Sequence, residues 1–250
     1  MFAPDGMPLV THTGAPDFGV REFALDRRGF AVLRDPPAEP GDSVQSAIQL
    51  ISDTLPPRIV ARVPLTRLRD AQGMSAMSAF FEDVPRWAVE SDSTALVASG
   101  TTLEVTRHFQ DGRAGDVVRS PELGNRPVSD TDLERERQRR RPAGSGGSMP
   151  SGMRQALDRA LADAEARAPA FHPFAAALRL LEDDTFVLRE TLVDADSVRW
   201  TLFDRDGAIL GQLRLDVRDR VVGGRRDRLL LITPDERDVP VVGWYRAKKR

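Results

Sequence analysis

The sequence contains no cysteine, a single asparagine and only two lysines among its 250 residues. Without cysteine, the chain has no disulfide bonds, no thiolate metal sites and no cysteine nucleophile. No apolar run reaches membrane-spanning length, and the residues after Met1 have neither the charged nor the apolar region of an export signal. We therefore expect a soluble chain with no membrane-spanning segment and no export signal, whose compartment cannot be inferred from redox chemistry.

An excess of one charge is also missing, because 36 Lys and Arg residues stand against 38 Asp and Glu residues. The net charge of −2 provides no overall field that would attract nucleic acid or an acidic membrane, so we expect no nucleic-acid partner. Almost all the cations are arginine, since Lys248 and Lys249 are the only lysines. This bias fits genome composition better than phosphate recognition.

The most prominent pattern in the sequence is a hairpin signal that occurs several times. Apolar residues from Trp200 to Leu215 flank the pair Asp206-Gly207, and such a pair favours a tight hairpin turn because glycine adopts positive φ without steric cost. The same device occurs at Asp111-Gly112 and, near the start of the chain, at Asp5-Gly6. Recurrence of one hairpin type predicts a repeat architecture.

Paired hairpins divide the sequence into four similar units. A unit with two complete hairpins has four expected strands, which is the content of one propeller blade. The units occupy residues 23–63, 87–118, 178–215 and 221–245. The interval from Leu178 to Val221 matches the roughly 40 to 45 residues of a propeller repeat. The last unit ends at its third strand, near Tyr245.

A helical insertion is predicted at 129–168, between the second and third units. Ser129 precedes Asp132 by three residues, which resembles a capping box, and a charged helix follows as far as Pro142. A flexible Gly-Ser break at 143–148 precedes a second helix from about Ser151 to Ala168. Its apolar stripe is thin and rich in alanine, so we expect this helix to be peripheral. The stripe consists of Met153, Leu157, Leu161, Ala164 and Ala168.

Several of these segments resemble the closing blades of bacterial six-bladed β-propeller proteins related to NHL-repeat propellers. The resemblance rests on residues 200–207, 210–213, 226–230 and 239–245, and on the insertion, and it covers most of the chain from about Phe80 onward. It implies a cell-envelope or periplasmic location. The sequence departs from the family in having about four units instead of six. Either amino-terminal blades are missing, which we favour, or fewer blades close with a strand at Met7–Thr11.

Metal chemistry of the kind found in propeller lactonases is not supported. Such enzymes hold a divalent cation with acidic and several asparagine side chains, and this chain has only Asn125, in a predicted loop. The three histidines, His12, His108 and His172, lie in unrelated segments without metal-ligand spacing, and we expect surface or turn positions for them.

The remaining candidate motifs also have structural interpretations. Paired acids at 183–184, 194–196, 204–206 and 235–236 fall at predicted turns, where aspartate bonds to nearby backbone amides. No nucleophile elbow is present, and Gly144–Gly147 lacks the lysine of a phosphate loop. The arginines from Arg135 to Arg141 are offset by neighbouring acids and favour a solvated helix face. Trp87, Trp200 and Trp244 recur at equivalent strand positions and favour packing between blades over a ligand cage.

These patterns predict an all-β fold: one β-propeller domain over residues 1–250, of the six-bladed type but incomplete, with the helical insertion at 129–168. Propellers commonly present binding loops on a rigid scaffold. We therefore expect a non-enzymatic scaffold that binds a protein, peptide or small ligand, with no catalytic, cofactor-binding or metal-binding residues. A propeller-type hydrolase or lyase is the alternative, and a truncated gene product without independent function is a third.

Overall fold

The fold is seen in a computed structural model that describes residues 20–26, 29–34, 45–51, 58–64, 79–141, 149–191 and 196–246. Within these ranges the chain is mainly β-strand, with two helices, and the strands form four antiparallel sheets. Each sheet consists of strands that are consecutive in the sequence. The prediction of a chain dominated by β-structure is confirmed. By internal contacts the chain divides into two compact units.

Unit 1 contains the first sheet, with the order β1-β2-β3-β4, together with residues 88–97 and 106–115. Its strands are β1 (Val20–Asp26), β2 (Gly29–Arg34), β3 (Gln45–Ile51) and β4 (Arg58–Pro64). Residues 88–97 and 106–115 belong to the sheet β5-β6-β7-β8, whose other residues belong to unit 2. Its strands are β5 (Arg86–Ser91), β6 (Thr94–Ala98), β7 (Thr102–Phe109) and β8 (Ala114–Gly124). All five residues of β6 are buried, as expected for an inner strand.

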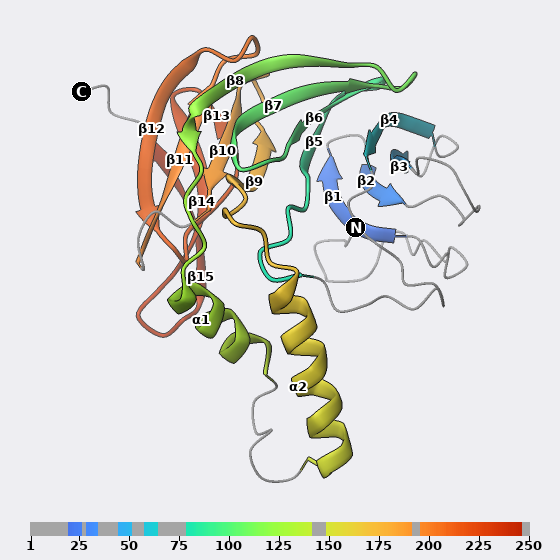
Figure 1. The fold of residues 1–250 in the computed structure, drawn as a ribbon. Helices are drawn as coiled ribbons and strands as arrows, with labels where there is room; N and C mark the ends of the chain where they lie inside the picture. Colours follow the sequence, from blue (N-terminus) through green and yellow to red (C-terminus); the bar gives the residue numbers. More distant parts are fainter. Residues whose placement is uncertain are drawn as a thin grey trace, which may run out of the picture. The chain divides into compact units, whose positions relative to one another are not determined.

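Unit 2 contains two further sheets and both helices (Figure 1). The first sheet has the order β12-β11-β10-β9 and the second β13-β14-β15. The strands are β9 (Ala175–Leu180), β10 (Phe186–Glu190), β11 (Ser197–Phe203), β12 (Ile209–Asp216), β13 (Arg220–Arg225), β14 (Arg228–Pro234) and β15 (Pro240–Arg246). The described part of the last sheet therefore has three strands where each of the others has four.

The core of unit 2 lies between these two sheets. Trp200 on β11 is 2% exposed and belongs to one apolar cluster with Val187 from its own sheet and with Val221, Leu229 and Leu231 from the other. Alternate residues of a strand point to the same face, so the inward sets of both sheets meet there. The predicted burial of Trp200 is confirmed.

The three tryptophans do not share one environment, although the sequence places them at equivalent strand positions. Trp87 is 4% exposed, like Trp200, but Trp244 on β15 is 52% exposed. The prediction of packing between blades is therefore wrong for Trp244. No described sheet covers its side of β15, and the guanidinium of Arg228 lies over its ring at 4.9 Å.

Aspartates organise the hairpin turns, as predicted. In the β11–β12 turn, Oδ1 of Asp204 accepts hydrogen bonds from the backbone amides of Asp206 and Ala208, at 3.0 and 2.8 Å. Asp235 accepts two amides in the same way in the β14–β15 turn. Gly207 has a φ of 90°, and a Cβ built there would lie 2.2 Å from the carbonyl oxygen of Val117. Glycine is therefore required both by the backbone conformation and by the close approach of β8.

Two helices, α1 (Asp130–Arg140) and α2 (Ser151–Ala166), form a helical hairpin that projects from unit 2 (Figure 1). The capping box at Ser129 and Asp132 is confirmed. On α2, Leu161 and Ala164 are buried against Phe80, whereas Met153, on the stripe identified from sequence, is 60% exposed. The apolar cluster thus includes α2 from Leu157 onward, and the first turn of the helix lies outside it.

Some predictions concern residues outside the described ranges. These are the turn at Asp5-Gly6, the strand at Met7–Thr11, the position of His12, the Gly-Ser break and Asp194 of the paired acids.

Candidate functional site

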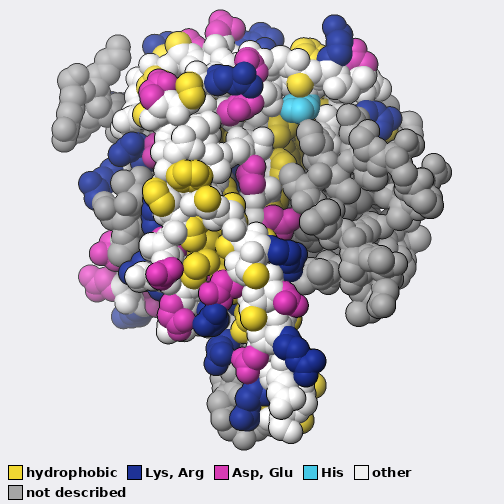
Figure 2. All heavy atoms as spheres, in the orientation of Figure 1, with side chains coloured by type: hydrophobic (Ala, Val, Ile, Leu, Met, Phe, Trp, Pro, Cys, Tyr) yellow, Lys and Arg dark blue, Asp and Glu magenta, His cyan; other side chains and the backbone are white. Residues whose placement is uncertain are grey.

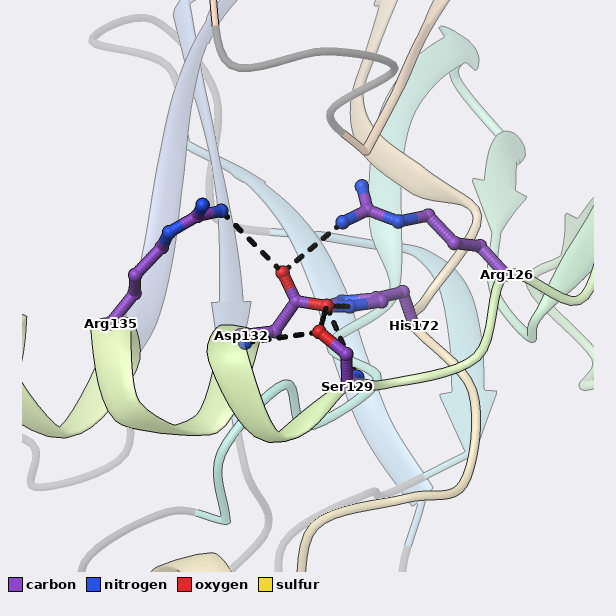
Figure 3. Close-up of polar contacts among 5 residues, drawn as sticks. All are labelled: Arg126, Ser129, Asp132, Arg135 and His172. Atoms are coloured by element: carbon purple, nitrogen blue, oxygen red, sulfur yellow. Dashed lines mark hydrogen bonds and ion pairs between the residues drawn. The ribbon is translucent and has the colours of Figure 1, made fainter.

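Polar side chains converge at the amino-terminal end of α1, around the carboxylate of Asp132 (Figure 3). Oδ2 of Asp132 accepts the Ser129 hydroxyl at 2.8 Å and the His172 ring nitrogen Nε2 at 3.1 Å. Oδ1 faces Arg126 at 3.2 Å and Arg135 at 3.9 Å. We call these five residues the Asp132 cluster. It ties the start of α1 to the segment that follows α2.

The backbone supports the same connection. Residues 126–128 and 170–172 run antiparallel, with an isolated bridge between Pro127 and Phe171. The amide of Val128 donates to the carbonyl of Ala170 at 3.0 Å, and the amide of His172 donates to the carbonyl of Arg126 at 2.9 Å. Both ends of the helical hairpin are therefore held together at its base.

The Asp132 cluster contains a serine, an aspartate and a histidine, but their order differs from that of a catalytic triad. In a triad the histidine lies between the nucleophile and the acid and takes the hydroxyl proton. Here Asp132 lies in the middle and takes the hydrogen bond from Ser129. Burial acts to raise the pKa of Asp132, but the hydrogen bonds from Ser129 and His172 and the charge of Arg126 outweigh it and lower the pKa to about 2. Such a carboxylate is a poor general base at neutral pH.

His172 and His108 are buried, so the prediction of surface or turn positions is wrong for both. His172 is 5% exposed, and its ring packs edge-on against that of Phe81, with 4.4 Å between the ring centroids. Its Nδ1 has no hydrogen-bond partner among the described residues. Because the carboxylate of Asp132 only accepts, Nε2 of His172 carries the proton of their bond.

His108 is 8% exposed and links two strands of unit 1. Its Nδ1 lies 3.0 Å from the carbonyl oxygen of Arg62 on β4, and its Nε2 lies 2.9 Å from the hydroxyl of Thr106. A carbonyl only accepts, so Nδ1 carries a proton and the neutral ring accepts the threonine hydroxyl at Nε2. Burial lowers the pKa of His108, although its bond to Arg62 opposes this. The residue is a neutral structural link.

A cavity of about 220 Å³ adjoins the Asp132 cluster, and we call it the Arg199 pocket. Loops and strand ends of unit 2 form it, from β7, β8, β10, β11 and the segment after α2. Its lining residues are Thr101, Gly124, Arg126, His172, Pro173, Phe174, Glu190, Thr191 and Arg199. A smaller cavity of about 70 Å³ shares Gly124, Phe174, Glu190 and Arg199 with it and extends toward Ile209. The lining of the Arg199 pocket combines polar groups, on Arg126, Arg199, Thr101 and Thr191, with apolar surface at Pro173 and Phe174.

Glu190 and Arg199 form the charged pair of this pocket. Phe186 pairs with Phe203 and Arg189 with Trp200, so the register of the β10–β11 hairpin places Glu190 opposite Arg199. Their side chains approach to 3.6 Å. Burial raises the pKa of Glu190, and the charge of Arg199 opposes that shift. Sequence reasoning missed this pair, because Glu190 follows the first hairpin predicted in this unit and Arg199 belongs to the second, so no predicted hairpin placed the two residues opposite each other.

Gly124 shapes the wall of the Arg199 pocket. Its φ is 118°, and a Cβ built there would lie 2.3 Å from the carbonyl oxygen of Thr101. The next residue, Asn125, donates its amide to the same carbonyl at 2.8 Å and accepts the Thr101 hydroxyl at 2.9 Å. The single asparagine of the chain thus fastens a loop, as its predicted loop position allows.

The arginine run of α1 is paired within the helical hairpin. The carboxylate of Glu136, which is 8% exposed, accepts hydrogen bonds from the guanidinium groups of Arg139 and Arg140, each at 2.7 Å. The guanidinium of Arg140 also lies over the ring of Phe80. The other ion pairs of this run are Arg135–Asp132, Arg137–Glu134, Arg137–Glu165 and Arg141–Asp158. Figure 2 shows cationic and anionic side chains interspersed along the hairpin. Such a surface presents no continuous basic stripe to a phosphate backbone.

No group of three or more potential metal-ligating side chains (His, Cys, Asp or Glu) is found among the described residues. Neither α1 nor α2, the helices of the described chain, is long and apolar enough to span a membrane.

Comparisons with known proteins add little. No family model matches the sequence, and no curated protein matches it. Among solved structures, the chain is similar to an acylaminoacyl peptidase from Pyrococcus horikoshii, with 6% sequence identity and a TM-score of 0.40. The match covers 92% of this chain and 31% of the peptidase chain. At this identity and score the likeness carries no argument, and the resemblance to six-bladed propellers stays a prediction.

Proposed function

We propose that this chain is a non-catalytic binding module of the β-propeller type, which takes a small polar ligand in the Arg199 pocket. One observation carries the proposal: the pocket offers charged and hydrogen-bonding groups around about 220 Å³, while its ionisable side chains are held by partners. Arg199 faces Glu190, and both Arg126 and His172 bond to Asp132. Groups held in this way are suited to recognition.

The propeller part of the proposal is supported by the order of the strands. All four described sheets are meanders of consecutive strands, and three of them have four strands. That is the content expected of successive propeller blades. The helical hairpin leaves the chain between the second and third sheets, where the family resemblance also has an insertion.

A catalytic role requires a nucleophile or a base with a free lone pair near the substrate. The Ser129 hydroxyl donates to Asp132, and it also accepts the amide of Asp132 as the helix cap. The carboxylate of Asp132 is too weakly basic for the task at neutral pH, with a pKa of about 2. Ser129 and Asp132 therefore support the fold of the helical hairpin. Nδ1 of His172 keeps a free lone pair among the described residues, and the lactone and ester assay below tests it as a base.

The lining of the pocket indicates the ligand class. The pocket is smaller than the roughly 300 to 1,000 Å³ of sites for drug-sized molecules, so we expect a ligand of metabolite size. Arg126 and Arg199 present planar donors that suit a carboxylate. Phe174 supplies an apolar wall, so a short aliphatic or aromatic carboxylic acid fits best.

A ligand-observed NMR screen of the full chain against small carboxylic acids, amides and sugars tests the proposal. We expect carboxylates to bind, and we expect Arg199→Ala to weaken that binding about tenfold or more, because a charge-assisted hydrogen bond is lost. Arg237→Ala, in the β14–β15 turn away from the pocket, is the matched control and should bind like the wild type.

Two results would contradict the proposal. One is equal binding by the Arg199→Ala protein and the wild type, or no binding at all. The other is turnover of lactones or activated esters above background that is lost in Ser129→Ala or His172→Gln. That second result would favour the hydrolase alternative instead.

A further inference from the structure

Strand β15 leaves an apolar surface open. Five of its residues or near neighbours are large hydrophobic side chains that are between 50% and 60% exposed, namely Val239, Val241, Val242, Trp244 and Tyr245. We call them the β15 surface. β15 pairs with β14 on one side only, and no other described strand pairs with it. An exposed apolar edge strand is a template for pairing with a further strand.

Both faces of the strand contribute to this surface. Leu229 and Leu231, which point into the core, pair with Tyr245 and Gly243, so Tyr245 and Val241 share the inner face of the sheet. Trp244 and Val242 alternate with them and point to the outer face. A strand added at this edge would therefore extend both apolar faces at once.

We propose that β15 pairs antiparallel with β15 of a second copy of the chain, about a two-fold axis through Gly243. With Gly243 opposite its counterpart, Val242 of each copy faces Trp244 of the other, and Val241 faces Tyr245. Pairs of a β-branched and an aromatic residue directly opposite one another stabilise antiparallel sheets. The small residue falls at the axis, where two bulky side chains would otherwise meet.

Charge favours the antiparallel direction. The turn before β15 carries Asp235, Glu236 and Asp238, and the strand ends at Arg246. In the proposed register Arg246 of one copy is diagonal to Asp238 of the other, and the side chain of Asp238 is 87% exposed. A parallel arrangement would bring like charges together at both ends, which is destabilising.

The size of this contact sets its strength. Two seven-residue strands bury less than the roughly 1,600 Å² of a standard interface, so we expect a reversible dimer with a dissociation constant near the micromolar range. Sedimentation of the full chain at protein concentrations below and above about 10 μM should show monomer and dimer in exchange.

The first test substitutes a charge into the strand edge. Val242→Lys should weaken dimerisation about tenfold or more, because each substitution acts twice in a two-fold dimer and lysine opposes edge pairing. Val222→Lys is the matched control, since Val222 is 42% exposed on β13, at the other edge of the same sheet. Equal weakening by both variants, or by neither, would overturn the proposal.

The second test uses the absence of cysteine from the chain. Gly243→Cys should form a disulfide-linked dimer under mild oxidation, because Cα atoms directly opposite in an antiparallel pair are about 4.5 to 5.5 Å apart, within disulfide range. The added Cβ meets only the Tyr245 ring, at 3.3 Å, and that ring can move. Val222→Cys should stay monomeric.

The same two experiments distinguish another possible partner for the edge of β15. If the chain's own Met7–Thr11 segment paired with β15, the wild type would sediment as a monomer at all concentrations and Gly243→Cys would not crosslink. That outcome would refute the dimer.

Discussion

Replacing Trp200 by alanine is the sharpest test of the core between the last two sheets. Trp200 is 2% exposed and packs among residues of both sheets. Truncating a buried tryptophan removes its transfer free energy and leaves a cavity, which together cost about 3 to 5 kcal/mol. We expect Trp200→Ala to lower the free energy of unfolding by about 4 kcal/mol, a large part of the stability of an ordinary domain.

A second substitution separates packing from polarity. Nε1 of Trp200 is buried without a hydrogen-bond partner among the described residues. An unsatisfied buried donor costs about 1 to 3 kcal/mol. Trp200→Phe removes that donor and keeps an aromatic ring, so the gain offsets much of the lost packing. We expect its unfolding free energy to fall by about 1 kcal/mol or less.

Urea unfolding followed by far-UV circular dichroism measures both changes. Trp244→Ala is the control, because Trp244 is 52% exposed, and in dilute protein it should cost about 1 kcal/mol or less. The reasoning is refuted if Trp200→Ala and Trp244→Ala shift the urea midpoint equally. The argument about the unpartnered Nε1 of Trp200 is refuted if Trp200→Phe lowers the free energy of unfolding as much as Trp200→Ala does.

Three further predictions concern single positions. Gly207→Ala should destabilise by about 2 kcal/mol or more, since φ is 90° and the new Cβ would meet Val117, whereas Gly211→Ala, with open space around it, should change stability little in thermal melts. The pKa of Asp132 is lowered to about 2, so its stabilising effect is present at neutral pH and is lost as pH falls from about 5 to 2. The full shift would correspond to about 2.4 kcal/mol, and solvent screening at the 43% exposed Arg126 reduces our expectation to about 1 kcal/mol. Unfolding free energies of wild type and Asp132→Asn should therefore converge in acid, and parallel pH curves would contradict this. Burial lowers the pKa of His108, so its neutral ring stabilises the fold above the unfolded pKa of about 6.5, and stability declines as pH falls below that value. His108→Gln should flatten this decline in denaturant titrations, and an unchanged slope would exclude the residue as its cause.

The Arg199 pocket and the two buried histidines could not be predicted from the sequence, because they arise from contacts between residues that are far apart along the chain. Asp132 and His172 are 40 residues apart, and His108 meets the Arg62 carbonyl across 46 residues. Each histidine is unremarkable within its own segment, so the sequence predicted a surface position for it. Only the paired segments at the base of the helical hairpin bring His172 to Asp132, and the Arg199 pocket exists because several separate chain segments meet beside them.

What the sequence determined by itself was local. The Asp206-Gly207 turn, the Ser129 cap and the succession of strands follow from backbone conformations and hydrogen bonds that span a few residues, and all are seen in the structure. Tertiary structure alone decided which strands are covered. Trp200 and Trp244 occupy similar patterns, but a neighbouring sheet lies over β11 and none of the described sheets lies over the outer face of β15. Burial is a property of what packs against a strand, which the strand's own residues do not specify.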